Sequence, residues 1–287
     1  MSSCAGGKTG GWRPRSSEDR SRRRLSPPSP TPRSKTWRRI VSERLFRIWR
    51  GTAAGGSFVE YRVDVDPGMV VLDVLHRIQA RLANDLAIRW NCKAGKCGSC
   101  SMEINGRPRL ACMTRMNQFG GAEMIAVQPM KTFPVVKDLV TDVSWNYEQN
   151  RRIPPFRPKP RPADGQYRMR QVDVDRVQEF RKCIECFLCQ DVCHVLRDQS
   201  RKDAFVGPRL MIRLASLEMH PLDTEDRVPA LREEFGSGLC NITRCCTEVC
   251  PEQIQITDNG IIPLKERVVD RYFDPLLGLV RKVFRRK

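Results

Sequence analysis

The sequence predicts an α+β fold, in which a small domain of mixed strands and helix precedes a mainly helical domain. Strand-like alternation of apolar and polar residues is confined to the first half of the ordered chain, and helical periodicity dominates the second half. A Pro- and Arg-rich segment at residues 151–166 separates the halves and is interpreted as a linker. With 287 residues, 40% of them apolar, the chain is long enough for a hydrophobic core in each domain.

The N-terminal segment, residues 1–43, is predicted to be a disordered basic extension. It is rich in Arg, Ser, Pro and Gly, and it buries too little apolar surface to offset the entropy lost on ordering. Residues 1–50 carry a net charge of +11 out of the chain's +18. Most of the positive charge therefore forms no face on a folded domain, and no nucleic-acid partner is expected. A nucleic-acid arm, a membrane-surface tether and an organelle transit peptide are the alternatives to an extension without function.

The first folded domain is predicted to span residues 44–150. Residues 45–49 and 59–65 are expected to be strands of one hairpin, because the second segment alternates apolar and polar side chains. Leucine and isoleucine at helical spacing predict an amphipathic helix over residues 72–82. An Asn-Gly pair at 105–106, between two short β segments, is a strong signal for a second hairpin. Two hairpins and a helix make a compact α+β domain.

The second folded domain, residues 167–271, is predicted to be helical and to be built around two cysteine runs, at 183–193 and 240–250. A basic C-terminal tail follows at 272–287. No stretch approaches the roughly 18 uninterrupted apolar residues of a transmembrane helix. The chain is therefore not expected to span a bilayer.

The thirteen cysteines are a high count for a chain whose N-terminus lacks the apolar core of a secretory signal. Metal binding is therefore favoured over disulfides. Cys92, Cys97 and Cys100 have the C-x4-C-x2-C spacing of plant-type [2Fe–2S] proteins, and the Asn-Gly turn returns Cys112 beside Cys100. Glycines in this loop let the backbone wrap tightly and direct its N–H groups toward sulfur. A zinc site is the alternative, although zinc ligands usually come as two close pairs.

The second half contains one cysteine motif twice. Its first copy has the C-x2-C-x2-C-x3-C spacing of bacterial ferredoxins, in which the fourth cysteine serves the other cluster. The copy that begins at Cys240 fits the same template, with Thr243 in place of the second cysteine. Such a repeat predicts two clusters that exchange a cysteine. The predicted [4Fe–4S] ligands are Cys183, Cys186, Cys189 and Cys250, and the three thiolates left for a [3Fe–4S] cluster are Cys193, Cys240 and Cys246.

Two further cysteines lie outside this scheme. Cys245 is an alternative fourth ligand that would complete a second [4Fe–4S] cube. Adjacent residues in a helical turn point about 100° apart, so Cys245 is expected to face away from the cluster that Cys246 binds. Cys4 lies in the N-terminal extension and is expected to have no role.

Five short motifs together carry a family resemblance: RWNCKAGKCGSC from residue 89, LAC at 110–112, FPVVKDLV at 133–140, CIEC at 183–186 and TEVCP at 247–251. They resemble the succinate dehydrogenase/fumarate reductase iron–sulfur subunit family. The resemblance implies a β-grasp [2Fe–2S] ferredoxin-like domain followed by an α-helical ferredoxin domain, an FAD-containing flavoprotein partner and a membrane anchor. It also implies that electrons pass between the flavin and a membrane quinone through the [2Fe–2S], [4Fe–4S] and [3Fe–4S] clusters, in a direction that the sequence does not specify.

The chain departs from many members of that family beside the predicted [3Fe–4S] ligands. Those members have proline and then a tryptophan pair where His194, Arg197 and Asp198 stand here, and histidine where Asn241 stands. Because these positions help form the quinone pocket in such members, His194, Arg197 and Asn241 are the candidate residues of the quinone vicinity. For His194, a proton donor or a hydrogen bond to cluster sulfur is weighed equally against a purely structural role.

The resemblance also implies a location: peripheral on the cytoplasmic face of the bacterial inner membrane, or on the mitochondrial matrix face in a eukaryote. The tail at 272–287 would then lie near the anchor or anionic lipid headgroups, with a plain surface helix as the alternative. Rival functions are another tandem-ferredoxin subunit, as in heterodisulfide reductases or glycolate oxidases, a zinc-organised nucleic-acid binder, and a scaffold without a redox role. Thr243 and the segment 133–140 argue against the first rival.

Overall fold

The computed structural model describes residues 42–121 and 123–274, which all belong to one compact unit. The predicted disordered extension lies outside the described residues, except that its last two residues already belong to the first strand. Most of the basic tail, from residue 275 onward, and Cys4 also lie outside them.

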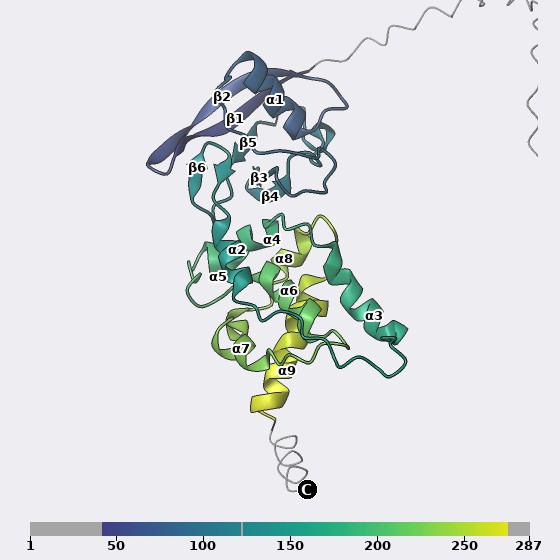
Figure 1. Ribbon diagram of the computed structural model, residues 1–287. Helices are drawn as coiled ribbons and strands as arrows, with labels where there is room; N and C mark the ends of the chain where they lie inside the picture. Colours follow the sequence, from purple (N-terminus) through teal and green to yellow (C-terminus); the bar gives the residue numbers. More distant parts are fainter. Residues whose placement is uncertain (1–41, 122, 275–287) are drawn as a thin grey trace, which may run out of the picture. The chain divides into compact units, whose positions relative to one another are not determined.

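A mixed sheet of seven strands organises the first half of the described chain, in the order β4-β3-β5-β1-β6-β7 with β2 beside β1 (Figure 1). The long strand β1 pairs antiparallel with β2 and parallel with β5. Both predicted hairpins are present, and α1 lies close to the predicted helix. The elements are β1 (Ser42–Thr52), β2 (Gly55–Val65), α1 (Val71–Arg81), β3 (Ser101–Ile104), β4 (Arg107–Leu110), β5 (Ile125–Gln128), β6 (Val135–Lys137) and β7 (Val140–Thr141).

The sheet and α1 share one core. Phe46 and Ile48 alternate along β1 and are fully buried, as are Leu75 and Ile78, which are three residues apart on α1. Alternation in a strand and a spacing of three or four in a helix each direct apolar side chains to one face. Burying a side chain of this size contributes roughly 1.5–3 kcal/mol to folding, so the pattern in the sequence is sufficient to fix which face of each element is inside.

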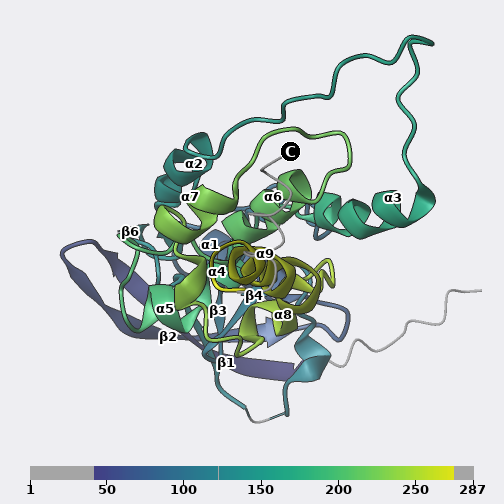
Figure 2. The same ribbon diagram turned by 90° about the horizontal axis from the view of Figure 1, so that it is seen from below.

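Short helices and turns make up the second half (Figures 1 and 2). A separate core forms around α6, whose Met211, Leu214 and Ala215 are fully buried. The helices are α2 (Ser144–Arg151), α3 (Gln171–Gln178), α4 (Leu188–Asp191), α5 (His194–Arg197), α6 (Pro208–Glu218), α7 (Val228–Glu233), α8 (Cys245–Glu248) and α9 (Ile262–Tyr272); 3-10 turns lie at Met116–Gln118, Glu179–Lys182 and Ser237–Leu239, and a π-helical turn at Ile256–Ile261.

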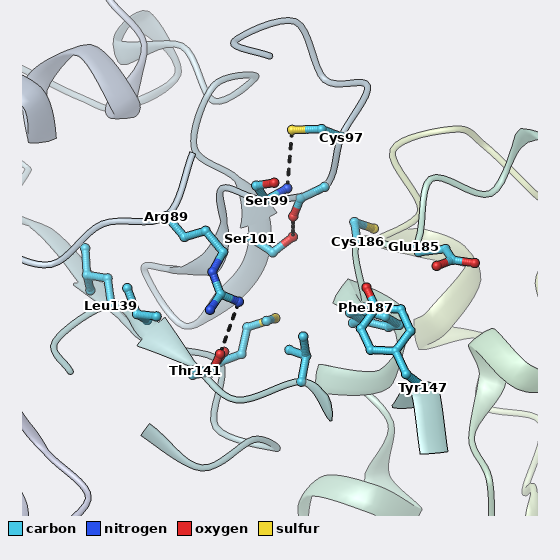
Figure 3. A pocket seen from close by; sticks show the side chains of 14 residues that line it. Arg89, Cys97, Ser99, Ser101, Leu139, Thr141, Tyr147, Glu185, Cys186 and Phe187 are labelled. Carbon is cyan, nitrogen blue, oxygen red and sulfur yellow. Dashed lines mark hydrogen bonds between the residues drawn. The ribbon is translucent and has the colours of Figure 1, made fainter. Parts of the chain in front are cut away.

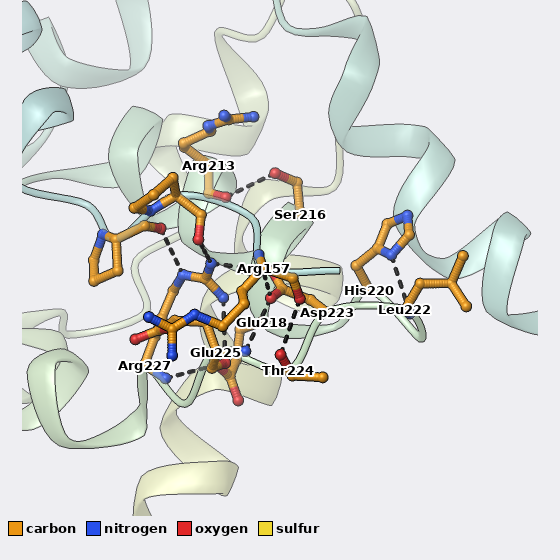
Figure 4. Close-up of polar contacts among 12 residues, drawn as sticks. Arg157, Arg213, Ser216, Glu218, His220, Leu222, Asp223, Thr224, Glu225 and Arg227 are labelled. Carbon is orange, nitrogen blue, oxygen red and sulfur yellow. Dashed lines mark hydrogen bonds and ion pairs between the residues drawn. The ribbon is translucent and has the colours of Figure 1, made fainter. Parts of the chain in front are cut away.

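The segment interpreted as a linker is fastened to the helical half by a buried arginine (Figure 4). Arg227 is fully buried, lies 3.0 Å from the Asp223 carboxylate and donates to the carbonyls of Pro154 at 3.0 Å and Pro155 at 2.7 Å. The amide of Thr224 donates to the Arg157 carbonyl at 2.9 Å. These contacts hold residues 154–157 against the loop that precedes α7.

None of the helices in the described part of the chain is long and apolar enough to cross a membrane.

Candidate iron–sulfur centres

The first cysteine loop places backbone amides around its sulfur atoms. The Cys92 sulfur accepts from the amides of Ala94 and Lys96, each at 3.3 Å. The Cys97 sulfur accepts from the amides of Cys92 and Ser99, each at 3.5 Å. Positive φ at two loop glycines, at positions 95 and 98, allows the chain to wind this tightly. Such N–H groups stabilise thiolates, which are the form that binds iron.

The hairpin of β3 and β4 brings the fourth predicted ligand to the same loop. The amide of Cys112 donates to the Cys100 sulfur at 3.5 Å, and both side chains are buried. Burial raises the pKa of the Cys100 thiol to about 12, and the thiols of Cys112 and Cys97 add to the shift. At Cys97, burial acts in the same direction, but hydrogen bonds from Ser99 and Cys92 lower the pKa to about 6. The structure thus assembles the four predicted [2Fe–2S] ligands.

The second predicted ligand set lines one apolar cavity, which suits a buried cluster. Ile212, Ile254 and Ile256 form part of its wall, and Arg209, ion-paired with Glu185, adds positive charge beside it. Burial raises the pKa of Cys186 to about 12 and also raises that of Cys189 well above its usual value, so iron must displace their protons on binding. Among the described residues, no three His, Cys, Asp or Glu side chains are close enough to hold a single metal ion. The cysteines that line the cavity are Cys183, Cys186, Cys189 and Cys250.

The two cysteine runs of the second half share one backbone conformation. Glu185 and Phe187 have φ of +55° and +61°, and the residues at the same places in the second run, Ile242 and Arg244, have +60° and +63°. Each run then continues into a four-residue helix, α4 or α8. Non-glycine residues seldom adopt positive φ, so the match of two such pairs supports the internal repeat. It places Thr243 where the first run has a cysteine.

The third predicted set is gathered around the second run. Burial raises the pKa of Cys193 and of Cys246 to about 11, and Cys240 is among the neighbouring thiols that raise both. The Cys246 sulfur lies 3.5 Å from the Thr257 hydroxyl. The structure therefore brings Cys193, Cys240 and Cys246 near one another.

The sequence predicts that Cys245 faces away from this set, but the structure places its sulfur near it. Its sulfur is 3.2 Å from the Thr243 hydroxyl and 3.5 Å from the Val192 carbonyl. Among the neighbouring thiols, it raises the pKa of Cys193 and of Cys246 more than Cys240 does. The repeat, however, aligns Cys245 with Leu188, a buried core residue that does not line the [4Fe–4S] cavity. The position thus favours packing over ligation.

The ligand loops of the two halves touch each other. Gly98 lies so near Cys186 that an added Cβ would be 2.6 Å from the Cys186 Cα and 3.0 Å from its nitrogen. Lys96 forms an ion pair with Glu252, next to the last cysteine run, at 3.2 Å. A cavity of about 110 Å³ lies beside the contact of Gly98 with Cys186. It is lined by residues of both loops, including Cys97, Ser99 and Phe187 (Figure 3).

The three residues predicted for the quinone vicinity lie near the third set but differ in their surroundings. His194 is exposed, and its Nδ1 is 2.9 Å from the Asp198 carboxylate. Asn241 is exposed in the second cysteine run. Arg197 is instead directed at a fully buried carboxylate, that of Glu103 on β3, with 3.0 Å between the charged atoms.

Sequence reasoning missed the buried acidic pair of Glu103 and Asp191. Burial, together with the neighbouring Glu103, raises the pKa of Asp191 to about 7. The Asp191 carboxylate accepts from the amide of Thr132 at 3.0 Å, which links α4 to the chain after β5. Acidic residues are rarely fully buried, so the amino-acid types gave no sign of this pair. The one usable signal was the position of Asp191 between two predicted ligands, Cys189 and Cys193.

Comparison with known proteins agrees with this geometry. Residues 45–148 match the family model described as a 2Fe-2S iron-sulfur cluster binding domain, and residues 179–254 match a 4Fe-4S dicluster domain. The chain is 61% identical to a chain in a solved structure, the Mycobacterium smegmatis Sdh1 complex in the apo form, with a TM-score of 0.80, covering 82% of this chain and 99% of that one. The predicted fold class, a [2Fe–2S] ferredoxin-like domain followed by a helical ferredoxin domain, is confirmed.

Curated relatives point the same way. A fumarate reductase iron-sulfur subunit of Mycobacterium tuberculosis is 32% identical over 69% of this chain and 81% of its own length. A succinate dehydrogenase iron-sulfur subunit of Bacillus subtilis is 30% identical over 69% of this chain and 81% of its own length. Another, of Paracoccus denitrificans, is 29% identical over 83% and 93%.

Proposed function

Because this chain belongs to the succinate dehydrogenase/fumarate reductase iron–sulfur subunit family, we propose that it carries electrons between an FAD-containing flavoprotein and a membrane quinone through [2Fe–2S], [4Fe–4S] and [3Fe–4S] clusters. As a member of that family it is an electron-transfer subunit of an oxidoreductase complex. The oxidation of succinate, or the reduction of fumarate, takes place on the flavoprotein.

In this proposal the thiols of the chain would hold all three clusters. When bound, clusters of these types accept and release single electrons. The loop at residues 92–100 with Cys112 would hold [2Fe–2S]. The cavity that Cys250 completes would hold [4Fe–4S] and would keep water from it, because its walls are largely apolar.

The observation that carries the proposal is the contact of Gly98 with Cys186. It joins a loop with the ligands of one cluster directly to a loop with a ligand of another, with no side chain between the two backbones. Electrons can therefore cross from the sheet half to the helical half at this point.

The last cluster and the quinone are assigned to the second cysteine run. Thr243 stands at the place of a fourth ligand, and a hydroxyl does not replace a thiolate in binding the fourth iron, which supports [3Fe–4S]. Leu239 and Ile242, on either side of Cys240, are exposed apolar residues. They give this end of the chain a surface that suits a membrane anchor and its quinone, with the complex on the cytoplasmic face of a bacterial inner membrane.

One experiment on the purified complex tests the proposal. Redox-poised electron paramagnetic resonance should resolve three distinct iron–sulfur signals, and chemical analysis should find about nine irons and ten acid-labile sulfides for this chain. About ten irons would indicate two full cubes and would overturn the [3Fe–4S] assignment. A colourless preparation that contains zinc would overturn the proposal as a whole.

A further inference from the structure

An ion pair between a fully buried carboxylate and a guanidinium whose side chain is 20% exposed joins the two halves of the chain. Glu103 lies on β3, three residues after the ligand Cys100, and its side chain is fully buried. One carboxylate oxygen is 3.0 Å from the Arg197 guanidinium, and the other accepts from the Gln128 amide at 2.5 Å. Lys131 is 3.9 Å away and half exposed, so Arg197 is the main source of positive charge at this carboxylate.

Arg197 also contacts the segment that carries the proposed ligands Cys189 and Cys193. It ends α5, and its backbone amide donates to the carbonyl of Cys193 at 2.8 Å. Asp191, between Cys189 and Cys193, is fully buried and interacts with both Glu103 and Arg197. The Arg197 guanidinium thus lies near two buried carboxylates, each close in the chain to proposed cluster ligands, and is 4.0 Å from the exposed carboxylate of Asp198.

The charge of this group acts where screening is weak. A buried carboxylate is costly unless it is paired and hydrogen-bonded, and the planar guanidinium suits such a pairing. Charges in the interior interact over longer distances than charges in water. Since net charge around an iron–sulfur cluster helps to set its reduction potential, this positive charge favours the reduced, more negative form of nearby clusters.

We propose that Arg197 is a positioning residue for electron transfer, which fastens the strand after Cys100 to the ligand turn of Cys193 and keeps the reduction potentials of the neighbouring clusters high through its charge. The carboxylate of Glu103 is its counterpart and acts on the potentials in the opposite direction. This inference rests on the proposed function, because it requires the clusters to be present.

The test compares two substitutions that break the same ion pair but change the charge in opposite ways. In the purified complex, Arg197→Met removes a positive charge and should lower the midpoint potentials of the clusters in redox-poised electron paramagnetic resonance. Glu103→Gln removes a negative charge, keeps the shape of the side chain and should raise them. The double variant should return toward the wild-type potentials, and Arg197→Lys should lie between Arg197→Met and wild type.

A matched control separates local charge from surface charge. Arg201, four residues further on, is 45% exposed and pairs with the exposed Asp203, so Arg201→Met should leave the potentials unchanged. Shifts in the same direction for Arg197→Met and Glu103→Gln would mean that the pair is only structural, and unshifted potentials in both would also overturn the inference. If Arg197→Met does not assemble, an unshifted Glu103→Gln overturns it alone. Missing cluster signals in the wild-type complex would instead refute the proposed function.

Discussion

Alanine at position 98 should force apart the two ligand loops through which we propose that electrons pass. The added Cβ would lie 2.6 Å from the Cα of Cys186, and ordinary contact begins at 3.4 Å, so the atoms must separate by about 0.8 Å. The three nearest atoms are the Cα, the Cβ and the backbone nitrogen of Cys186, none of which can rotate out of the way. One of the two loops must therefore move as a whole.

The size of the effect follows from two costs. An L-residue in the left-handed region, here at φ of +69°, costs roughly 1–2 kcal/mol. Overpacking at a close contact costs roughly 1–3 kcal/mol more. We expect Gly98→Ala to lower the apparent stability by roughly 2–5 kcal/mol, the sum of these two costs.

Gly106→Ala is a control with the same backbone conformation but without a close neighbour. Its φ is +73°, and an added Cβ there meets no atom within 4 Å. It should therefore bear only the cost of the left-handed backbone, roughly 1–2 kcal/mol. The difference between the two variants isolates the contact between the loops.

The assay has two readouts on the purified complex. Thermal unfolding compares apparent stability, and rapid-freeze electron paramagnetic resonance after mixing with succinate follows reduction of the first cluster and then of the others. In Gly98→Ala, reduction beyond the first cluster should be slower than in Gly106→Ala, because the loops are further apart. Equal stability and equal rates in the two variants would refute the reasoning.

Three further substitutions, the last with a matched control, test the ligand assignments and the strap, which is the segment 154–157 held by Arg227. Thr243→Cys should convert [3Fe–4S] to [4Fe–4S], lower the potential of that cluster and slow quinone reduction; survival of the oxidised [3Fe–4S] resonance would mean that Thr243 is not at the vacant corner. Cys245→Ser should leave the iron count and all three resonances unchanged, and loss of a signal would make Cys245 a ligand. Arg227→Met, which leaves the buried Asp223 unpaired, should destabilise the complex toward urea by roughly 3–5 kcal/mol, whereas Arg157→Met, at an exposed ion pair, should cost about 1 kcal/mol or less.

The cluster ligands could be predicted from sequence because metal clusters require cysteines at short, fixed spacings. The repeat required only that the second cysteine run be aligned with the first, which shows Thr243 at a position where the first run has a cysteine. The first hairpins and α1 were predictable for a similar reason: alternation and helical spacing are local patterns. At Thr243 the backbone agrees with the repeat, because the second run matches the first in φ at the residues on each side of it; the missing ligand itself stays a prediction.

The later strands and the contacts of residues 154–157 were harder to predict from the sequence. Strands β6 and β7 have three and two residues. Segments this short become strands only through their partners, because β6 pairs with β1 and β7 pairs with β6. The strap depends on Arg227, whose carbonyl partners lie in a segment about seventy residues earlier in the chain. Composition alone made that segment look like a free linker.

Gly98 and Glu103 show why the spacing of ligands does not by itself determine the path of electrons. Both residues lie close to Cys100 in the chain. Their proposed roles, however, depend on contacts with Cys186 and Arg197, and the sequence around Cys100 does not indicate those contacts. At Gly98 the absence of a side chain permits the backbones to touch. At Glu103 a buried charge would drive the halves apart unless Arg197 neutralised it. The close approach of the loops therefore depends on both: glycine removes the steric barrier, and the ion pair removes the electrostatic one.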